Sequence, residues 1–416
     1  MNLGLALRIM RTFTRAVKRR ARKVAWLYEL VRARRAKRQE EEYIFLRESQ
    51  YRKTEALFSQ PGWKSRASEQ LQKCWKRRDP VKESPNQVRI FLAATDDLGG
   101  PRILSSFQRH FETIVFDLRR FRHMDPGGEA ERAIEDIDTW RPRLHKELLG
   151  EFSRAHSARP VDLVFAYGSH LDFEPDTFKR IRASGVPVAL LCLDDKHIFR
   201  EKNYGYPNGQ EPLIGSADVH ITNSLECVRW YMAHGVAGYF MPQGIDPEMF
   251  KPVQITKDLD VSFIGQRYGG RGRLVDALRA CGIRVACFGA GWETPSISDA
   301  EKVELYSRSR VNLGLGGTGL SNRITCIKGR DFEVPACGGL YLTTYNYELA
   351  PMFDIGKEIL CYYNEIDCAE IIRYYLERPH QAAAIGQAAR QRCLKDHTWE
   401  KRITGLVEWM GICEKQ

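Results

Sequence analysis

Three glycine-rich turns follow apolar runs in the second half of the sequence and could bind phosphate. They are 265–271 (GQRYGGR), 289–292 (GAGW) and 316–319 (GGTG). Glycines such as Gly265, Gly289 and Gly316 let a backbone approach an anion closely, and Arg267 or Arg271 would supply charge-assisted hydrogen bonds. Any turn from a strand to a helix favours glycine, so each turn alone also has a structural explanation. Three such turns on one sheet edge favour a site for a phosphorylated ligand.

The stretch 314–319 (GLGGTG) also satisfies the G-x-G-x-x-G spacing of dinucleotide-binding turns. That motif belongs to the first strand-helix unit of a domain and is followed, about 20 residues later, by an acidic residue at the end of the next strand. Here it falls in the third unit, and the next predicted strand ends at 343–346 (TTYN). A dinucleotide cofactor is therefore not predicted.

A second cluster with chemical potential lies at 328–339 (KGRDFEVPACGG). Its part from Arg330 to Gly339 resembles a recurring signature of GT-B glycosyltransferases. Glu348, 356–360 (GKEIL) and 397–402 (HTWEKR) resemble the closing part of the same domain in the spore-maturation-type branch of that superfamily. The resemblance covers roughly residues 160 to 410 and is strongest from 311 to 402. It implies an α/β GT-B fold, with two Rossmann-like domains in tandem facing across a cleft, donor on the second and acceptor on the first.

The resemblance also implies roles for individual residues. The glutamate at the position of Glu333 binds the ribose hydroxyls of a nucleotide, which suits an acceptor-only carboxylate. Lys328 and Arg330, together with Arg267, would offset the charge on a leaving nucleoside diphosphate, so no metal and no permanently bound cofactor is expected. Outside the family, Glu333 would be a solvated helix carboxylate and Arg330 part of a surface ion pair. Many retaining enzymes carry a second glutamate eight positions earlier, where this chain has Thr325, and this difference leaves retention or inversion of the sugar open.

Metal-dependent sugar transfer commonly uses an Asp-x-Asp string, and the chain contains two of them, at 136–138 (DID) and 258–260 (DLD). The first lies in a predicted long helix. The second leads into a strand at the amino edge of its sheet, away from the edge that binds ligands. Both are interpreted as structural.

Candidate bases for an acceptor hydroxyl follow the strands predicted in the first domain. They are Asp97, His170, Asp194 and Asp195. A general base must be an Asp, Glu or His within hydrogen-bond reach of the hydroxyl, and these four qualify by placement at strand ends. Capping of loops and helix starts is the alternative role for each of them.

The elements that must position these residues are predicted from apolar runs that alternate with helical stretches. Strands are expected at 88–94, 113–118, 162–167, 186–193, 219–222 and 239–241, and again at 261–264, 285–288, 311–315, 340–343 and 359–362. Helices are expected in the second unit at 271–281, 299–307, 323–336, 367–377, 380–395 and 399–410. We therefore predict an N-terminal Rossmann-like acceptor domain at 86–245, a donor domain at 246–396 and a final helix at 397–416 that crosses back to the N-terminal domain.

The region before residue 86 differs from the rest in charge. The first 80 residues carry 22 Lys and Arg against 8 Asp and Glu, whereas the remaining 336 carry 42 against 45. Residues 1–85 are predicted to form a basic helical extension and a linker. Residues 1–38 could lie on an anionic membrane surface, or the helix could dock on its own protein or in a coiled coil. Nucleic acid is the least favoured partner, because the rest of the chain has no nucleic-acid module.

Cysteine usage and hydropathy bear on the compartment. The 11 cysteines include no C-x-x-C pair, which argues against a zinc site, and several lie in apolar strands as free thiols would in a reducing compartment. No apolar run approaches the ~20 residues that span a bilayer, and the Arg-rich start does not resemble a signal peptide. A cytoplasmic location is expected, with peripheral attachment to the inner face of a membrane as an added option.

The sequence thus predicts an enzyme that transfers a sugar from a nucleoside-diphosphate donor to a glycan, lipid or protein acceptor. Synthesis of a polysaccharide, a lipid-linked glycan or a surface glycoconjugate is the expected setting. Two alternatives stay open. One is a nucleotide-sugar epimerase of the same fold, and the other is a catalytically inert GT-B-like protein recruited to a membrane.

Overall fold

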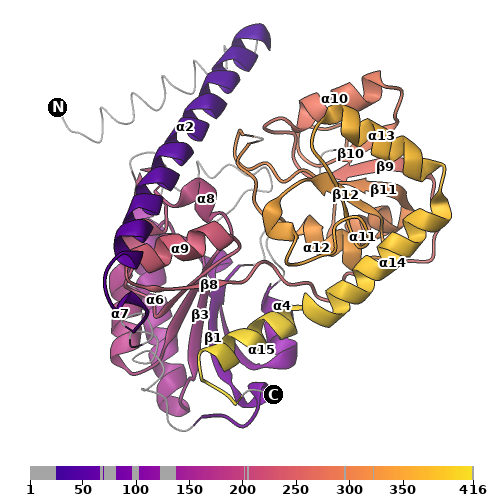
Figure 1. Ribbon diagram of the computed structural model, residues 1–416. Helices are drawn as coiled ribbons and strands as arrows, with labels where there is room; N and C mark the ends of the chain where they lie inside the picture. Colours follow the sequence, from indigo (N-terminus) through magenta and orange to yellow (C-terminus); the bar gives the residue numbers. More distant parts are fainter. Residues whose placement is uncertain are drawn as a thin grey trace.

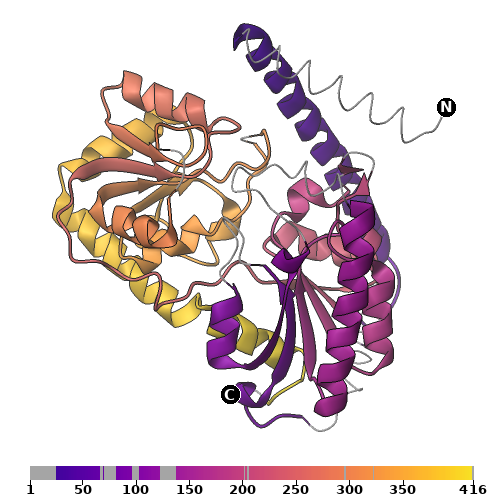
Figure 2. The same ribbon diagram turned by 180° about the vertical axis from the view of Figure 1, so that it is seen from behind.

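The computed structural model describes residues 25–65, 69, 81–95, 103–121, 137–200, 202–203, 206–294, 297–321 and 323–414. Figures 1 and 2 show two α/β units side by side, with the long helix α2 (Ala25–Phe58) rising along the first of them. None of the helices in the described part is both long and apolar enough to span a bilayer.

The N-terminal domain is built on a six-stranded sheet in which every pairing is parallel, in the order β2-β1-β3-β4-β7-β8. Its strands are β1 (Arg89–Ala94), β2 (Glu112–Asp117), β3 (Leu163–Tyr167), β4 (Val188–Cys192), β7 (Val219–Thr222) and β8 (Ala237–Phe240), and a small hairpin pairs β5 (Lys202–Asn203) with β6 (Tyr206–Pro207). Its helices are α4 (Ile103–His110), α6 (Ile137–Ala158), α7 (Pro175–Ala183), α8 (Asp195–Ile198) and α9 (Leu225–Ala233), with single turns η1 (Pro85–Gln87), η2 (Leu118–Arg120) and η3 (Glu211–Leu213).

Both faces of this sheet are covered, as a parallel sheet requires. Helices α6 and α7 bury Leu144 and Phe178 against one face. Helix α4 buries Phe107 against the other face, where it is joined by the final helix α15 (Trp399–Trp409). The segment predicted to cross back to the N-terminal domain therefore lies in that domain's core.

The C-terminal domain has a five-stranded sheet, also parallel throughout, in the order β10-β9-β11-β12-β13. Its strands are β9 (Leu259–Ile264), β10 (Val285–Phe288), β11 (Ser309–Leu313), β12 (Tyr341–Thr344) and β13 (Leu360–Tyr362). Its helices are α10 (Arg271–Ala280), α11 (Asp299–Arg308), α12 (Arg330–Ala336), α13 (Glu365–Leu376) and α14 (Pro379–Asp396), with the single turn η4 (Tyr347–Leu349). Helices α10 and α13 pack on one face and α11 and α12 on the other, and α14 contributes Ala382 to the first core and Cys393 to the second.

The chain crosses between the domains at two segments that pair with each other. The backbone NH of Ile245 donates to His397 O at 2.9 Å, and that of Trp399 donates to Ile245 O at 3.1 Å. Gly244 is needed here, because a Cβ at this position would lie 2.6 Å from the backbone nitrogen of Trp399. Arg109 of α4 adds an ion pair to Asp246. The two crossings thus form one joint.

Two predicted helices differ from the structure. The helix expected at 323–336 starts only at Arg330, because residues before it pair back with the preceding glycine-rich turn. Thr318 NH donates to Ile324 O at 2.9 Å, and Cys326 NH donates to Gly316 O at 3.0 Å. The extension, expected to be helical almost to residue 80, is interrupted after Phe58 by the turn at Pro61 and Gly62, and residues 63–65 and 69 are helical again. Residues 1–24, 66–68 and 70–80 lie outside the described residues.

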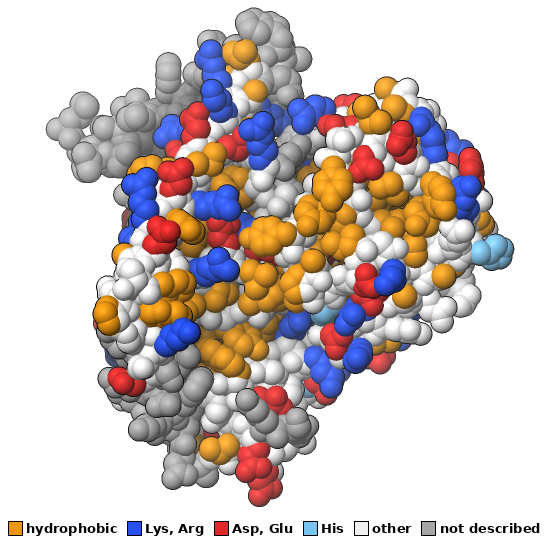
Figure 3. All heavy atoms as spheres, in the orientation of Figure 1, with side chains coloured by type: hydrophobic (Ala, Val, Ile, Leu, Met, Phe, Trp, Pro, Cys, Tyr) orange, Lys and Arg blue, Asp and Glu red, His pale blue; other side chains and the backbone are white. Residues whose placement is uncertain are grey.

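Helix α2 docks on its own protein, which was one of the alternatives for this segment. Its inward side chains recur at steps of three and four, and they are Ala36, Gln39, Tyr43, Leu46, Gln50 and Thr54. Basic and acidic side chains alternate along the outer face (Figure 3), with pairs such as Arg38 with Glu42. The outer face of the described part therefore carries charges of both signs beside exposed apolar side chains such as Ile44 and Phe45.

Candidate active site

A cavity of about 420 Å³ lies between the two domains at the carboxyl edge of the C-terminal sheet. The turns after β9 and β10 and the starts of α11 and α12 form one wall, and the N-terminal domain supplies the other. Seven residues predicted from the sequence line it together: Asp194, Gly265, Arg271, Gly289, Lys328, Arg330 and Glu333. The fold thus gathers one acceptor-side and six donor-side candidates in one place.

Gly265 shapes the floor of this cavity. Its φ is +150°, and a Cβ there would lie 2.9 Å from Nη1 of Arg330 and 3.2 Å from Nη1 of Arg271. A side chain here would therefore push both guanidinium groups out of their observed positions. The glycine at the end of β9 allows two arginines from different elements to come close together.

The two arginines concentrate positive charge. Arg271 is 4% exposed, donates from Nη1 to Gln266 O at 2.9 Å and stacks on the ring of Tyr268 at 3.9 Å. Arg330 donates to Leu315 O at 3.4 Å. Neither guanidinium lies within ion-pair distance of a carboxylate in the described part of the chain, and the Nε atoms of both are buried without a hydrogen-bond partner there.

The two like charges lower the pKa of one arginine but not of the other, because neighbouring groups including Asp331 raise the pKa of Arg330. Burial, and then the neighbouring charge of Arg330, lower the pKa of Arg271 to about 10. Each guanidinium has several N–H donors in a planar fork that matches phosphate oxygens. The pair can therefore bind a phosphate or diphosphate and offset charge that develops on it.

Glu333 lies in the first turn of α12, on the same wall. Its Oε2 accepts from the Tyr306 hydroxyl at 2.9 Å, and the remaining lone pairs can accept from ligand hydroxyls. Asp331, two residues earlier, is turned into the core, where it accepts from the Tyr341 hydroxyl at 2.6 Å and the backbone NH of Lys328 at 2.7 Å. Asp331 thereby fixes the turn that presents Lys328, Arg330 and Glu333 to the cavity.

Lys328 connects the donor wall to the acceptor wall. Its Nζ lies 3.3 Å from Oδ1 of Asp194, which follows β4 in the N-terminal domain and whose side chain is 49% exposed. Burial alone would lower the pKa of Lys328, but the Asp194 carboxylate, together with Cys326 and Tyr268, raises it. A charged ammonium and an accessible carboxylate thus face each other across the cavity.

A second contact between the domains is a buried ion pair. Lys196 of α8 donates to Oε2 of Glu348 at 2.7 Å and to the carbonyl of Thr325 at 3.1 Å. Ser224 at the start of α9 donates to the other Glu348 oxygen at 2.7 Å. Burial alone would lower the pKa of Lys196, but Glu348 raises it. Thr325 contributes its backbone carbonyl to this contact between the domains.

Four predicted site residues lie outside the cavity lining, and they are Arg267, Gly316, His170 and Asp195. Arg267 stacks over the Trp292 ring at 5.0 Å and pairs with Asp276 at 3.3 Å. Gly316 packs beside Thr325, and the backbone NH of His170 is bonded to Gly209 O in the N-terminal domain. Of the two arginines predicted in this turn, Arg271 lines the cavity and Arg267 does not.

Asp195 requires a larger correction. Its side chain is completely buried and accepts from the Tyr231 hydroxyl at 2.8 Å, and burial raises its pKa to about 7. A carboxylate in this position cannot reach an acceptor that diffuses into the cleft. Its hydrogen bond with Tyr231 holds α8 on α9 instead. Asp97 lies outside the described residues and remains a prediction.

The two Asp-x-Asp strings were interpreted as structural. Asp258 pairs with Arg308 at 2.6 Å, and Asp260 pairs with Arg284 at 2.6 Å, at the amino end of β9. Asp138 lies in the first turn of α6, and Asp136 lies outside the described residues. The described aspartates of both strings, Asp138, Asp258 and Asp260, are thus not among the residues that line the cavity.

Sequence reasoning missed several lining residues. Tyr167 and Leu193 end or follow β3 and β4, Gln243 follows β8, and Tyr306 lies on α11. The first three positions could have been found, because they follow predicted strands at the ligand-binding edge. Tyr306 gives no such signal, since its hydroxyl reaches Glu333 only through the packing of α11 on α12.

Comparison with known proteins agrees with this architecture. Residues 271–408 match the sequence model of a family described as glycosyl transferase-like. No curated protein sequence matches the chain significantly.

Solved structures resemble the chain over most of its length. A glycosyltransferase from Rickettsia africae is 12% identical, with a TM-score of 0.51 over 80% of this chain and 100% of its own. Sucrose-phosphate synthase from Thermosynechococcus elongatus is 13% identical, with a TM-score of 0.50 over 77% and 98%. HepE from Anabaena, in complex with UDP-glucose, is 13% identical, with a TM-score of 0.50 over 76% and 98%. The protein has the GT-B fold that the sequence predicted, and its C-terminal domain carries a glycosyl transferase-like sequence.

Proposed function

We propose that this protein is a glycosyltransferase that moves a sugar from a nucleoside-diphosphate donor to an acceptor hydroxyl. The observation that carries the proposal is the pair Arg271 and Arg330, two guanidinium groups without a carboxylate partner among the described residues, beside Gly265 in the cavity between the domains. A nucleoside diphosphate matches this charge. The family match at 271–408 and the GT-B fold support the same reading.

In this proposal the donor lies along the wall formed by the C-terminal domain. Its diphosphate contacts Arg271 and Arg330, and its ribose hydroxyls donate to Glu333. HepE, a structure of the same fold, contains UDP-glucose, so UDP and UDP-glucose are the first ligands to test.

The transfer step forms a bond from the acceptor oxygen to the anomeric carbon and breaks the bond from that carbon to the diphosphate. The electron pair leaves with the nucleoside diphosphate, whose growing charge is stabilised by Arg271, Arg330 and Lys328 without a metal ion. The proton of the hydroxyl passes to a base. Asp194 is the proposed base, because it lines the cavity and is accessible.

The acceptor is a glycan, a lipid-linked glycan or a protein in this proposal, and its identity requires a screen. Purified protein is incubated with UDP-glucose and other nucleotide sugars, with and without pooled oligosaccharide acceptors, while nucleotide release is followed. We expect acceptor-dependent release that Arg330→Ala abolishes. Arg284→Ala is the control, because Arg284 is exposed at the opposite edge of the sheet.

Three results would contradict the proposal. If the protein bound none of the nucleotides, a nucleoside-diphosphate sugar would be excluded as its donor. Interconversion of the sugar with donor alone would identify an epimerase instead. Unchanged nucleotide release by Arg330→Ala would show that Arg330 does not stabilise the charge on the leaving diphosphate.

The proposal places the enzyme in the cytoplasm, with an anionic membrane surface as a partner of residues 1–38. Its support is the excess of basic residues before residue 80. Co-sedimentation with phosphatidylserine vesicles tests it, with phosphatidylcholine vesicles as the control. Equal sedimentation of the full chain and of a variant lacking residues 1–24 would argue against a role for that segment.

A further inference from the structure

Helix α2 contacts both domains, but by different kinds of contact. Its second half packs on α9 of the N-terminal domain, where Leu46 is buried beside Trp230 and Tyr231. The Tyr43 hydroxyl donates to Glu226 at 2.7 Å, and Gln50 lies 3.0 Å from His234. An apolar contact flanked by hydrogen bonds fixes this half of α2 to the N-terminal domain.

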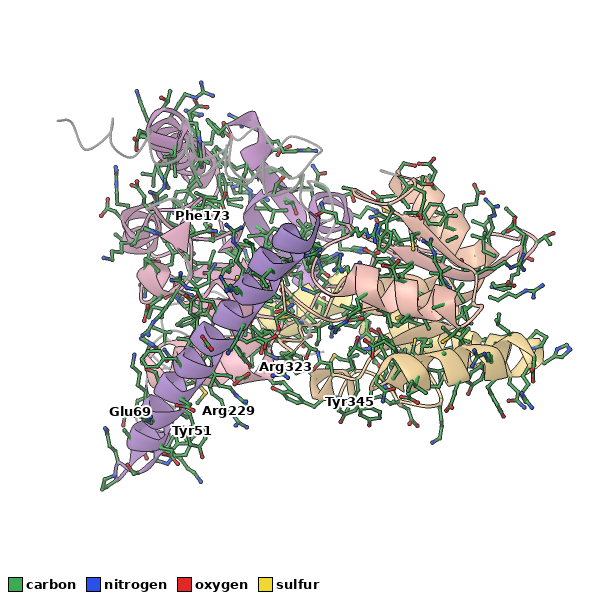
Figure 4. The ribbon with its side chains drawn as sticks, turned by 90° about the horizontal axis from the view of Figure 1, so that it is seen from above. Tyr51, Glu69, Phe173, Arg229, Arg323 and Tyr345 are labelled. Atoms are coloured by element: carbon green, nitrogen blue, oxygen red, sulfur yellow. The ribbon has the colours of Figure 1, made fainter. Side chains whose placement is uncertain are left out.

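The first half of α2 reaches two glycine-rich turns of the C-terminal domain through polar side chains. Arg32 donates to the carbonyl of Gly269 at 2.6 Å. Gln39 accepts from the backbone NH of Leu320 at 2.8 Å, and Glu40 accepts from the Ser321 hydroxyl at 2.6 Å. In the view from above (Figure 4), Arg323 of the same turn lies between α2 and Tyr345 of the C-terminal domain, and its guanidinium is 3.8 Å from Glu40.

The turns that α2 contacts support the proposed donor site directly. Gly269 stands between Tyr268 and Arg271, which both line the cavity. A Cβ on Gly269 would lie 3.3 Å from the carbonyl of Gly319, so the two turns pack on each other. Displacing either turn would therefore move the guanidinium of Arg271.

Gln39 occupies the centre of this junction. A Cβ on Gly319, whose φ is +58°, would lie 2.1 Å from Nε2 of Gln39, so the amide occupies the space that a side chain at Gly319 would need. The same Nε2 lies 2.5 Å from Nδ1 of His197 on α8. Helix α8 begins directly after Asp194, so one side chain touches the donor turn and the helix that follows the proposed base.

We propose that α2 is an intramolecular clasp that holds the donor-binding turns in register with the N-terminal domain, and that Gln39 is its positioning residue. The clasp deepens the proposed function, on which it rests for the identity of the ligand. Its grip on the C-terminal domain is polar and local, whereas its anchor on α9 is apolar. Loss of Gln39 should therefore release the turns without detaching the helix.

Hydrogen exchange and nucleotide binding test the clasp separately. In Gln39→Ala and in Arg32→Ala we expect faster amide exchange at 265–271 and 317–321, with exchange in α9 unchanged. The affinity for UDP, measured by titration calorimetry, should fall about tenfold in Gln39→Ala. Gln39→Glu keeps an acceptor for the Leu320 NH and should retain the affinity.

Arg38→Ala is the matched control, because Arg38 is the neighbouring residue, is exposed and pairs only with Glu42 among its described ion pairs. It should change neither measurement. Unchanged exchange in Gln39→Ala and Arg32→Ala would overturn the clasp. Faster exchange with unchanged UDP affinity would overturn the positioning role of Gln39. If the wild-type protein bound no nucleotide, the proposed function would fail, while the exchange result would still decide whether α2 holds the turns.

Discussion

At the scale of single residues, the cavity brings two like-charged groups together without a carboxylate partner among the described residues. Arg271 and Arg330 both lie beside Gly265 in the cavity. Burial and the charge of Arg330 lower the pKa of Arg271. Perturbed ionisable groups of this kind cluster at functional sites, because an incoming ligand supplies the missing charge. The described ion pairs elsewhere on the surface, such as Lys357 with Asp354, place opposite charges side by side instead.

Glu333 gives the first prediction at this scale. Glu333→Ala should lower the affinity for UDP by roughly tenfold to a hundredfold, because a hydrogen bond to a charged group is worth about 1.5–3 kcal/mol. The same variant should bind a 2′,3′-dideoxy analogue of UDP as well as wild type does. Titration calorimetry with both ligands checks this double comparison, and equal losses for both ligands would show that Glu333 does not contact the ribose.

The buried ion pair of Lys196 and Glu348 gives a second prediction at the residue scale. Glu348→Ala should lower the free energy of unfolding by about 3–5 kcal/mol, because it leaves a buried ammonium without its carboxylate. The double variant Lys196→Met with Glu348→Leu should lose less than Glu348→Ala alone. Urea denaturation measures both, and the exposed Lys357→Ala serves as the control, with an expected loss below about 1 kcal/mol. A similar small loss in Glu348→Ala would mean that the pair is hydrated in solution.

At the scale of elements, most strands and helices could be predicted from the sequence. Strands β7 and β10 lie at their predicted bounds, and β10 (VACF) has the continuous apolar run that is typical of a buried parallel strand. The start of α12 could not be predicted. The residues before it pair with the preceding glycine-rich turn, and Thr325 bridges to Gly317. Helical spacing in the sequence gives no sign of this pairing.

Helix α15 gives a prediction about elements. Leu406→Ala should destabilise the N-terminal domain by about 2–5 kcal/mol, because Leu406 is completely buried in that domain's core although it follows the C-terminal domain in sequence. Lys401→Ala, on the exposed side of the same helix, should change stability by less than about 0.5 kcal/mol. Thermal unfolding checks both variants. Hydrogen exchange shows which domain loses stability in Leu406→Ala. A loss confined to the C-terminal domain would contradict this packing.

Site residues were less predictable than the elements that carry them. Glycine turns and the segment 328–333 point to the correct edge of the sheet, but the choice between Arg267 and Arg271 depends on packing. Arg267 is drawn aside by Trp292 and Asp276, two partners from other turns. Asp195 shows the same limit, since burial by α9 becomes visible only once the helices are placed.

At the scale of the whole molecule, three buried histidines predict how stability depends on pH. Burial lowers the pKa of His145 to about 4, of His220 to about 3 and of His397 to about 4. In the unfolded chain their pKa is near 6.5. Between pH 6.5 and about 4 the unfolded state therefore binds more protons, so the free energy of unfolding should fall as the pH is lowered through that window. Asp195 opposes this trend, because its raised pKa of about 7 lets the folded state take up one proton first.

The net effect should be a loss of about 1.4 kcal/mol per pH unit for each excess proton bound by the unfolded state. Urea denaturation at pH 7 and at pH 5 measures the slope. His220→Phe should flatten it, since His220 is buried without a described hydrogen-bond partner, whereas the exposed His380→Gln should leave it unchanged. Stability that rises on acidification would contradict the assignment of these histidines as neutral in the folded protein.

The whole account depends on what the cavity between the two domains binds. A crystal structure of the full chain soaked with UDP, and with ADP and GDP for comparison, tests this most directly. The account predicts the diphosphate of one of these nucleotides against Arg271 and Arg330 beside Gly265, with the ribose hydroxyls on Glu333. An empty cavity in crystals soaked with all three, or a nucleotide bound away from Arg271 and Arg330, would contradict it.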